Sequence, residues 1–158
     1  MLNNLIRFLK DAKVVVIIGM GNELRADDAV GLYVVRRLKS FSSSRLKVFE
    51  GQMTPEVYIG QACAAYPTHV LIIDAAELGK EPGMWQILLP EKIEPGLFTT
   101  HSIPAVEVAA EINRRCGAEV VFVGIQPRSR DVSIGLSTDC QKAVEEIVEV
   151  IQQVLSQS

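Results

Sequence analysis

The hydrophobic pattern of the chain alternates between short continuous apolar runs and longer segments whose apolar residues recur at helical spacing. Continuous runs rich in β-branched residues are typical of strands buried on both faces of a parallel sheet. These runs predict strands at Val14–Ile18, Leu46–Glu50, Val70–Asp74, Met84–Leu89 and Glu119–Gln126. The periodic segments predict helices at Met1–Lys10, Ala29–Leu38, Pro55–Ala65, Ser102–Arg115 and from Thr138 onward. The alternation indicates one α/β domain over residues 1–158, without repeats or a domain linker.

The connection that precedes the fourth strand sets the direction of that strand. Residues 75–83 carry no helical pattern and include a turn over Gly79–Gly83. A parallel crossover needs about a dozen residues or more and commonly holds a helix. We therefore expect the strand Met84–Leu89 to run antiparallel to the others, in a mixed five-stranded sheet.

The first strand leads into a glycine loop, Gly19-Met20-Gly21, and then into a helix that has Asp27 and Asp28 at its start. Ligands of open α/β sheets bind outside the carboxyl ends of the strands. A dinucleotide site is disfavoured here, because Leu24 replaces the third glycine of the GxGxxG motif and two carboxylates would repel pyrophosphate. The loop is otherwise either structural, with Asp27 as the helix cap, or a cation site built from clustered oxygen ligands.

Two further residues with metal-binding side chains follow other elements of the sheet. Asp74 ends the third strand, where burying a carboxylate without a partner is costly, although a loop cap is an alternative. His101 lies at a loop-to-helix junction rather than on an apolar helix face. If both open beside Asp28, two carboxylates and one imidazole suit a divalent transition metal such as nickel or zinc. Spacing alone also permits a chance arrangement of these three residues.

Composition limits the classes of partner and the cellular location that we expect for the protein. The chain has 158 residues, 48% of them hydrophobic, and a net charge of −3, which argues against nucleic acid as a partner. No apolar run approaches the roughly 20 residues that cross a bilayer, so no membrane partner is expected. Met1–Lys10 lacks the apolar centre and cleavage site of a signal peptide. We therefore expect a cytoplasmic protein in which this segment is a short docking helix.

The cysteines and the second histidine give no signal of a catalytic nucleophile or base. Cys63, Cys116 and Cys140 are isolated and form no CxxC pair, so buried thiols are favoured over a disulfide framework. His69 precedes the third strand, at the amino end of the sheet, where sites are seldom found. We expect His69 to have a surface role.

Four segments of the chain carry a specific family resemblance. They are GMGNELRADDAVG at 19–31, LIIDAAELG at 71–79, TTHSIP at 99–104 and VFVGIQP at 121–127. In this order, they resemble the hydrogenase maturation endopeptidases, the processing proteases of [NiFe] hydrogenases. The Gly-Ile-Gln-Pro and Thr-Thr-His elements look most like the subgroup that serves the formate-hydrogenlyase hydrogenase.

The resemblance implies a fold, a reaction and a set of site residues. The implied fold is a three-layer α/β/α sandwich with strand order 2-1-3-5-4 and an antiparallel fourth strand. The implied reaction removes the C-terminal extension of a nickel-loaded [NiFe]-hydrogenase large-subunit precursor. Asp28, Asp74 and His101 fall on the family's metal-contacting and catalytic positions. The substrate would supply the nickel, and another divalent metal can occupy such a site in vitro.

Two features bear on this assignment. After the second strand, family members often show Asp-Gly-Gly, whereas this chain has Glu50-Gly51-Gln52. The alternative from another class is a phospho-receiver signalling domain with an acidic pocket of Asp27, Asp28 and Asp74. A receiver needs a lysine at the end of the fifth strand, where this chain has Gln126, and it has no use for His101 or an antiparallel strand.

Overall fold

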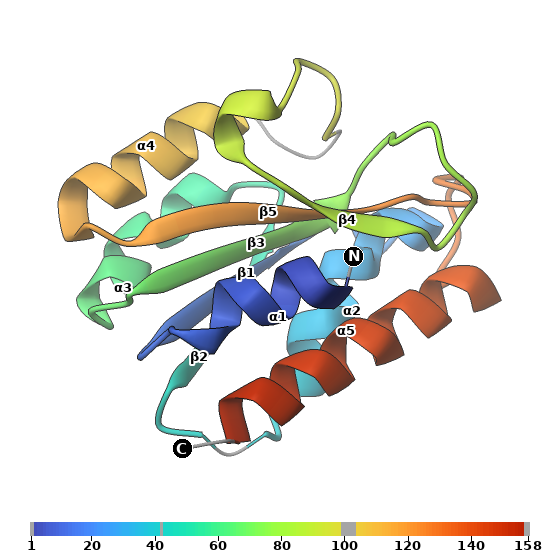
Figure 1. Ribbon diagram of the computed structural model, residues 1–158. Helices are drawn as coiled ribbons and strands as arrows, with labels where there is room; N and C mark the ends of the chain where they lie inside the picture. The colour runs from blue at the N-terminus through green and yellow to red at the C-terminus, as the bar shows by residue number, and fades with distance from the viewer. Residues whose placement is uncertain (1, 42, 99–103, 157–158) are drawn as a thin grey trace.

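The structure, a computed structural model, describes residues 2–41, 43–98 and 104–156 (Figure 1). Its sheet contains β1 (Val15–Met20), β2 (Leu46–Gln52), β3 (His69–Ala75), β4 (Trp85–Leu88) and β5 (Glu119–Ile125). The strand order is β2-β1-β3-β5-β4. All neighbours are parallel except β4, which pairs antiparallel with β5. The predicted order and the predicted direction of the fourth strand are both confirmed.

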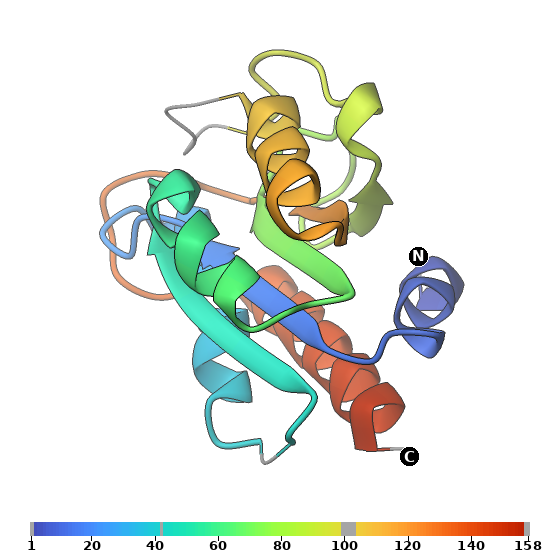
Figure 2. The same cartoon turned by 90° about the vertical axis from the view of Figure 1, so that its left-hand side faces the viewer.

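Helices cover both faces of the sheet and complete three layers (Figures 1 and 2). One face carries α1 (Leu2–Lys10), α2 (Val30–Leu38) and α5 (Thr138–Ser156), and the other carries α3 (Ile59–Ala64) and α4 (Ala105–Cys116). Short 3₁₀ turns add η1 (Ala26–Ala29), η2 (Pro55–Tyr58) and η3 (Pro90–Lys92). The α/β/α sandwich is therefore confirmed, although two of the predicted helices, at 29–38 and 55–65, start in 3₁₀ turns.

The core consists of two hydrophobic clusters, one on each face of the sheet. Every residue of β1 and of β3 is buried, as the continuous apolar runs predicted. Burying one Leu, Ile or Val side chain contributes roughly 1.5–3 kcal/mol, so these two strands anchor both clusters. Trp85 is 1% exposed, and its Nε1 donates a hydrogen bond to Glu146 Oε1 at 2.9 Å, which fixes β4 against α5.

Two predictions about packing were wrong. The helical spacing over residues 102–115 predicts that Val106 faces inward, but Val106 is 45% exposed, because the small Ala105 and Ala109 side chains of α4 face the core instead. His69 was expected at the surface but is only 9% exposed. The Phe8 ring from α1 packs edge-to-face with the His69 imidazole, with the two ring centroids 4.9 Å apart, and His69 Nε2 lies 3.2 Å from Glu119 Oε2.

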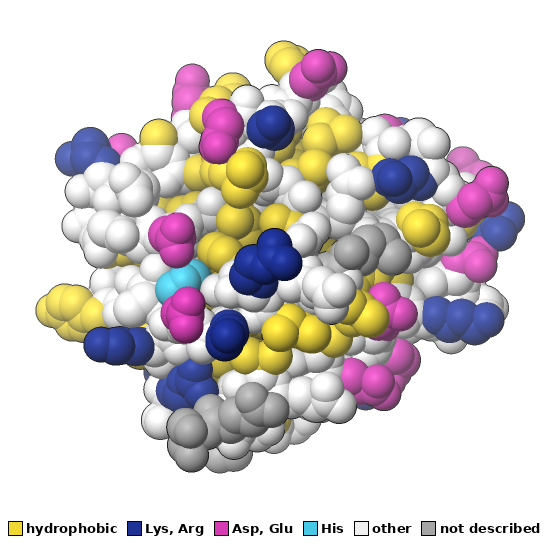
Figure 3. Space-filling view, in the orientation of Figure 1, with side chains coloured by type: hydrophobic (Ala, Val, Ile, Leu, Met, Phe, Trp, Pro, Cys, Tyr) yellow, Lys and Arg dark blue, Asp and Glu magenta, His cyan; other side chains and the backbone are white. Residues whose placement is uncertain are grey.

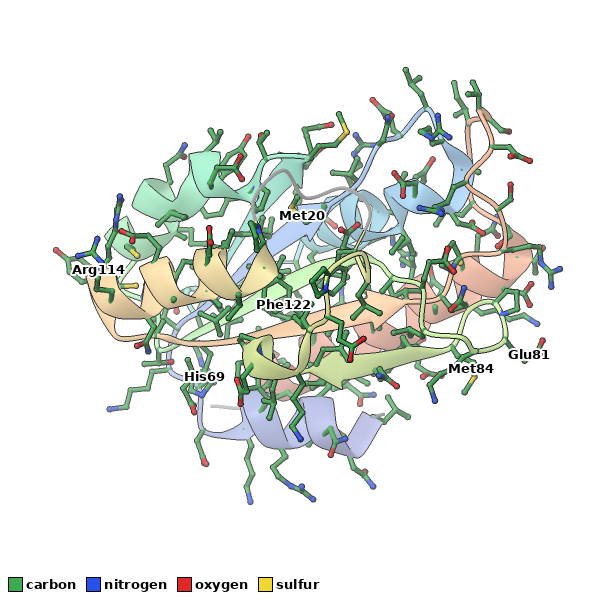
Figure 4. All side chains as sticks on the ribbon, turned by 90° about the horizontal axis from the view of Figure 1, so that it is seen from above. Met20, His69, Glu81, Met84, Arg114 and Phe122 are labelled. Atoms are coloured by element: carbon green, nitrogen blue, oxygen red, sulfur yellow. The ribbon has the colours of Figure 1, made fainter. Side chains whose placement is uncertain are left out.

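The parallel strands give the sheet an amino end and a carboxyl end, which two labelled residues locate. His69 is the first residue of β3, at the amino end of the sheet, and Met20 is the last residue of β1, at the carboxyl end (Figure 4).

On the face seen in Figure 3, acidic and basic side chains are interspersed with apolar ones and do not separate by sign. Within the described part of the chain, no helix is both long and apolar enough to cross a membrane.

Candidate active site

The carboxyl end of the sheet is shaped by a close contact between α2 and the strands. A Cβ built on Gly31 would lie 2.2 Å from the Ile73 carbonyl oxygen and 2.4 Å from the Met20 carbonyl oxygen. Only glycine allows this approach, since no side chain fits between the helix and the two backbones. The preceding turn η1, which carries Asp27 and Asp28, consequently packs against β3.

Asp28 and Asp74 lie at the ends of neighbouring parallel strands. Asp28 follows β1 and is 5% exposed, and Asp74 is fully buried near the end of β3. The Ala75 amide donates a hydrogen bond of 2.8 Å to Asp74 Oδ1. The sheet therefore brings two of the three sequence-predicted site residues to one end, and their metal-binding and catalytic roles stay predictions.

The third predicted site residue, His101, lies outside the described residues. The chain that leads toward it is described as far as Phe98, which forms an antiparallel bridge with Ala76. The Glu77 amide also donates a hydrogen bond of 3.0 Å to the Leu97 carbonyl oxygen. This bridge lies two positions after Asp74 in the sequence. Among residues 2–41, 43–98 and 104–156, no three His, Cys, Asp or Glu side chains form a group that could hold a metal ion.

A cleft of about 740 Å³ opens beside Asp28. Its lining is mostly polar and carries both signs of charge. The lining residues are Asn22, Arg25, Asp28, Met53, Glu77, Gln126, Pro127, Arg128, Ser129, Arg130 and Asp131. Loops that follow β1, β2, β3 and β5 all contribute, so the cleft lies where open α/β sheets bind their ligands.

Asp27 has a role that sequence reasoning missed. It was expected to cap the helix after the glycine loop, but η1 has no side-chain cap. Its carboxylate instead accepts hydrogen bonds from the loop before α5: from the Arg128 amide at 2.8 Å, and from the Ser137 amide and hydroxyl at 2.7 and 2.8 Å. Burial alone would raise the pKa of this carboxyl, but the hydrogen bonds from Ser137 and Arg128 outweigh burial and lower the pKa.

The loop before α5 is also joined to the glycine loop through the backbone. The Ala26 amide donates to the Ser133 carbonyl oxygen at 2.8 Å, and the Ser133 amide donates to the Leu24 carbonyl oxygen at 3.0 Å. Ala26 adopts a left-handed conformation with φ of 50°, which is unfavourable for a residue with a Cβ. These contacts join segments about a hundred residues apart, so no local sequence pattern could have indicated them.

Gln126 connects the loops that follow β3 and β5. Its Oε1 accepts a hydrogen bond of 2.7 Å from the Leu78 amide, and its Nε2 donates one of 3.2 Å to Glu77 Oε2. Arg130 reaches the other oxygen of Glu77 at 3.4 Å. Gln126 therefore holds two walls of the cleft together at the position where a phospho-receiver would need a lysine.

The departure at 50–52 is accommodated without loss of the strand. Glu50 forms ion pairs with Arg36, at 3.0 Å, and with Lys39, which link the end of β2 to α2. A bulge follows, because Gly19 pairs with Glu50 whereas Met20 pairs with Gln52. Gln52 adopts φ of 53° there, a conformation that glycine would adopt without strain.

Comparison with known proteins decides the family. Residues 32–154 match the family model described as hydrogenase maturation protease. The chain belongs to the hydrogenase maturation protease family. It is 30% identical over 139 residues to the hydrogenase 3 maturation protease of Escherichia coli K12, a match that covers 87% of this chain and 86% of the relative. Against the hydrogenase 2 maturation protease of the same strain, identity is 26% over 153 residues, covering 91% and 92%.

Solved structures agree with this family assignment. The crystal structure of a [NiFe] hydrogenase maturation protease from Thermococcus kodakarensis is similar with a TM-score of 0.90 and 30% identity, over 98% of this chain and 99% of that one. The family and the fold together support an endopeptidase role in hydrogenase maturation. They lend no support to the phospho-receiver alternative.

Proposed function

We propose that this maturation protease removes the C-terminal extension of a nickel-loaded [NiFe]-hydrogenase large-subunit precursor. The observation that carries the proposal is the pair of buried carboxylates at the carboxyl end of the sheet: Asp28 lies in η1 and lines the polar cleft, and Asp74 lies near the end of the neighbouring strand β3. The family assignment supports the reaction class, and the solved relative from Thermococcus kodakarensis is named for a [NiFe] hydrogenase.

Nickel enters this proposal as part of the substrate, because it arrives in the precursor. The residues that would contact it are Asp28, Asp74 and His101, and two carboxylates with one imidazole are a donor set that suits a divalent transition metal. Such an ion acts as a Lewis acid toward the scissile carbonyl or toward the attacking water. Burial of both carboxylates limits their hydration, which strengthens their attraction to a cation.

The cleft residues would position the peptide on either side of the cut bond. Arg25 and Arg130 offer guanidinium donors to carbonyl or carboxylate oxygens of the extension. The ion pair with Arg130 and the hydrogen bond from Gln126 hold the Glu77 side chain in place in the cleft lining. The chain itself would therefore supply the groups that orient the peptide and the charges that attract it.

The cytoplasmic location expected from the sequence stays a prediction.

The test is a cleavage assay on a nickel-loaded large-subunit precursor, read by the change in its gel mobility. The unmodified protein should release the extension. Asp28→Asn, Asp74→Asn and His101→Ala should each abolish cleavage while the fold persists. For the two Asp→Asn variants the thermal midpoint should be retained, because each removes one of two like charges. Asp11→Asn, an exposed change after α1 at the other end of the sheet, is the matched control and should cleave normally.

Two outcomes would contradict the proposal. Normal cleavage by all three variants would exclude these residues from the reaction. Unfolding of the variants without a selective loss of cleavage would instead assign these residues to structure. Incubation with a small phosphodonor tests the receiver alternative, which requires a stable acyl phosphate on Asp74.

A further inference from the structure

Two of the three cysteines meet on the face of the molecule that carries α3 and α4. Cys63 lies in α3, and Cys116 is the last residue of α4, the helix that carries the labelled Arg114 in Figure 4. Their Sγ atoms are 2.8 Å apart. Both side chains are only half-buried free thiols, whereas Cys140 is fully buried elsewhere.

The local packing holds the two sulfur atoms together. Cys116 Sγ donates to the Ile112 carbonyl oxygen at 3.3 Å, and Cys63 Sγ lies 3.9 Å from the same oxygen. Both cysteines pack against the second hydrophobic cluster, which favours positions of both helices that keep the two thiols adjacent. A disulfide has an S–S length of about 2.05 Å, so bond formation requires the sulfur atoms to approach by less than about 1 Å.

We propose that Cys63 and Cys116 are a modification site, at which a low-molecular-weight disulfide installs a reversible intramolecular disulfide. One cysteine attacks the oxidant as its thiolate, forms a mixed disulfide and releases one molecule of small thiol. The second cysteine then attacks the protein sulfur of that mixed disulfide, which forms the Cys63–Cys116 bond and releases the second small thiol. The oxidant gains two electrons, and the two released thiols take up the two protons of the cysteines.

The surroundings of Cys63 make its thiol a poor nucleophile at neutral pH. Burial, followed by the hydrogen bond with Cys116, raises the pKa of the Cys63 thiol to about 12, and the nearby Arg115 opposes this only in part. A thiol with a high pKa forms little thiolate at neutral pH and reacts slowly. Oxidation should therefore be slow at pH 7 and should become faster in alkaline buffer.

The bond would link the carboxyl-terminal ends of α3 and α4. Cys63 and Cys116 are 53 positions apart, and the enclosed segment contains β3, β4 and Asp74. Closing a loop of this length in the unfolded chain removes conformational entropy, so the thermal midpoint should rise by on the order of 10 °C.

The test compares the reduced full-length protein with the protein treated with oxidised glutathione at pH about 8.5. After removal of the oxidant, each sample is denatured and alkylated with N-ethylmaleimide, and the mass of the intact chain is measured by mass spectrometry. The reduced chain should take up three labels, one for each of its 3 cysteines. The oxidised chain should take up a single label, on Cys140, and its proteolytic map should show the peptides of Cys63 and Cys116 joined.

Variants separate this bond from general effects of oxidation. Cys63→Ser and Cys116→Ser should show no rise in thermal midpoint with oxidant, whereas Cys140→Ala should retain the rise. Three labels after oxidation, or glutathione adducts without the internal link, would overturn the proposal. A rise that persists in Cys63→Ser would overturn it as well. If a serine variant fails to fold, the label count and peptide map of the unmodified chain still decide the question.

Discussion

Ser137 donates two hydrogen bonds to the carboxylate of Asp27, one from its amide at 2.7 Å and one from its hydroxyl at 2.8 Å. The same hydroxyl accepts a hydrogen bond from the Cys140 amide, so Ser137 is also the N-cap of α5. A single residue therefore connects the start of α5 to the turn that carries Asp28. The local pattern Thr138-Asp139-Cys140-Gln141 fits a capping box with Thr138 as the cap, but Thr138 is the first residue of the helix instead.

Asp27→Asn should destabilise the fold by about 1–3 kcal/mol, because the new amide group would face backbone and hydroxyl donors in a buried position. Urea unfolding followed by the fluorescence of Trp85 measures this loss. Precursor cleavage should also fall, since residues 128–131 of the cleft lose their anchor. Ser137→Ala, which removes only the hydroxyl, should cost about 1 kcal/mol. Equal stability of Asp27→Asn and the unmodified protein would refute this role.

Gly31→Ala should destabilise the protein by about 3 kcal/mol, because its methyl group would overlap backbone atoms that are fixed in the sheet. Gly60→Ala is the matched control. Apart from its chain neighbours and the backbone of α3 itself, no atom lies within 4 Å of a Cβ at that position, so this change should stabilise the helix by roughly 0.5–1 kcal/mol. Urea midpoints of both variants decide the prediction, and it fails if the two changes have the same sign.

Gln52→Gly should stabilise the protein by about 1 kcal/mol, because it relieves the left-handed conformation at the bulge of β2. The hydrogen bond from the Gly21 amide to the carbonyl of residue 52 needs no side chain and should persist. Lys47→Gly, an exposed change in the same strand, should cost roughly 0.5–1 kcal/mol. A loss of stability in both variants would show that no strain is stored at the bulge.

Glu50→Gln should weaken the protein at neutral pH by about 1 kcal/mol and have little effect in acid. The hydrogen bond from Lys39 lowers the pKa of Glu50 below its ordinary value of 4.5; burial opposes this, and Arg36 adds to it. The contribution is therefore present above about pH 4.5 and is lost as the pH falls through the lower, folded-state pKa. Unfolding curves at pH 7 and pH 3 measure the change, with exposed Glu149→Gln on α5 as control. A loss that is equal at both pH values would contradict the ion-pair explanation.

Nickel should bind the isolated protein weakly, because the proposed ligands leave positions open for the substrate. Calorimetric titration of Ni²⁺ should show an affinity that falls by about 10-fold or more in Asp28→Asn and is unchanged in Asp11→Asn. Binding should weaken in acid, since the carboxylates must be ionised and the imidazole neutral. Stoichiometric nickel that survives treatment with a chelator would instead indicate a self-sufficient metalloprotease.

The sequence predicted the strands well, because a strand that is buried on both faces needs a continuous run of apolar residues, which is visible in the local sequence. The continuous apolar runs of β1 and β3 indicated strands covered on both faces, and the short connection after β3 indicated the antiparallel β4. The strand order came from the family resemblance, because local patterns do not specify which strands are neighbours.

The sequence did not separate the roles of adjacent Asp27 and Asp28, and the reason is physical. Both are acids at the start of a helix, but Asp27 is bonded to a loop about a hundred positions away, while Asp28 lines the cleft. His69 was misjudged for a similar reason, since its burial depends on where α1 packs. Contacts between distant segments decide such roles, and only the folded chain shows them.

The parallel pairing of the central strands has a consequence for folding kinetics. Val15 pairs with His69, and His69 pairs with Glu119, so the middle of the sheet forms only after two long segments have closed. Proteins dominated by such distant pairings fold slowly, because loop-closure entropy is lost before the contacts form. Asp74 lies in the strand shared by both pairings. The proposed site should therefore assemble late, and a chain halted before β5 docks would have helices but no competent cleft.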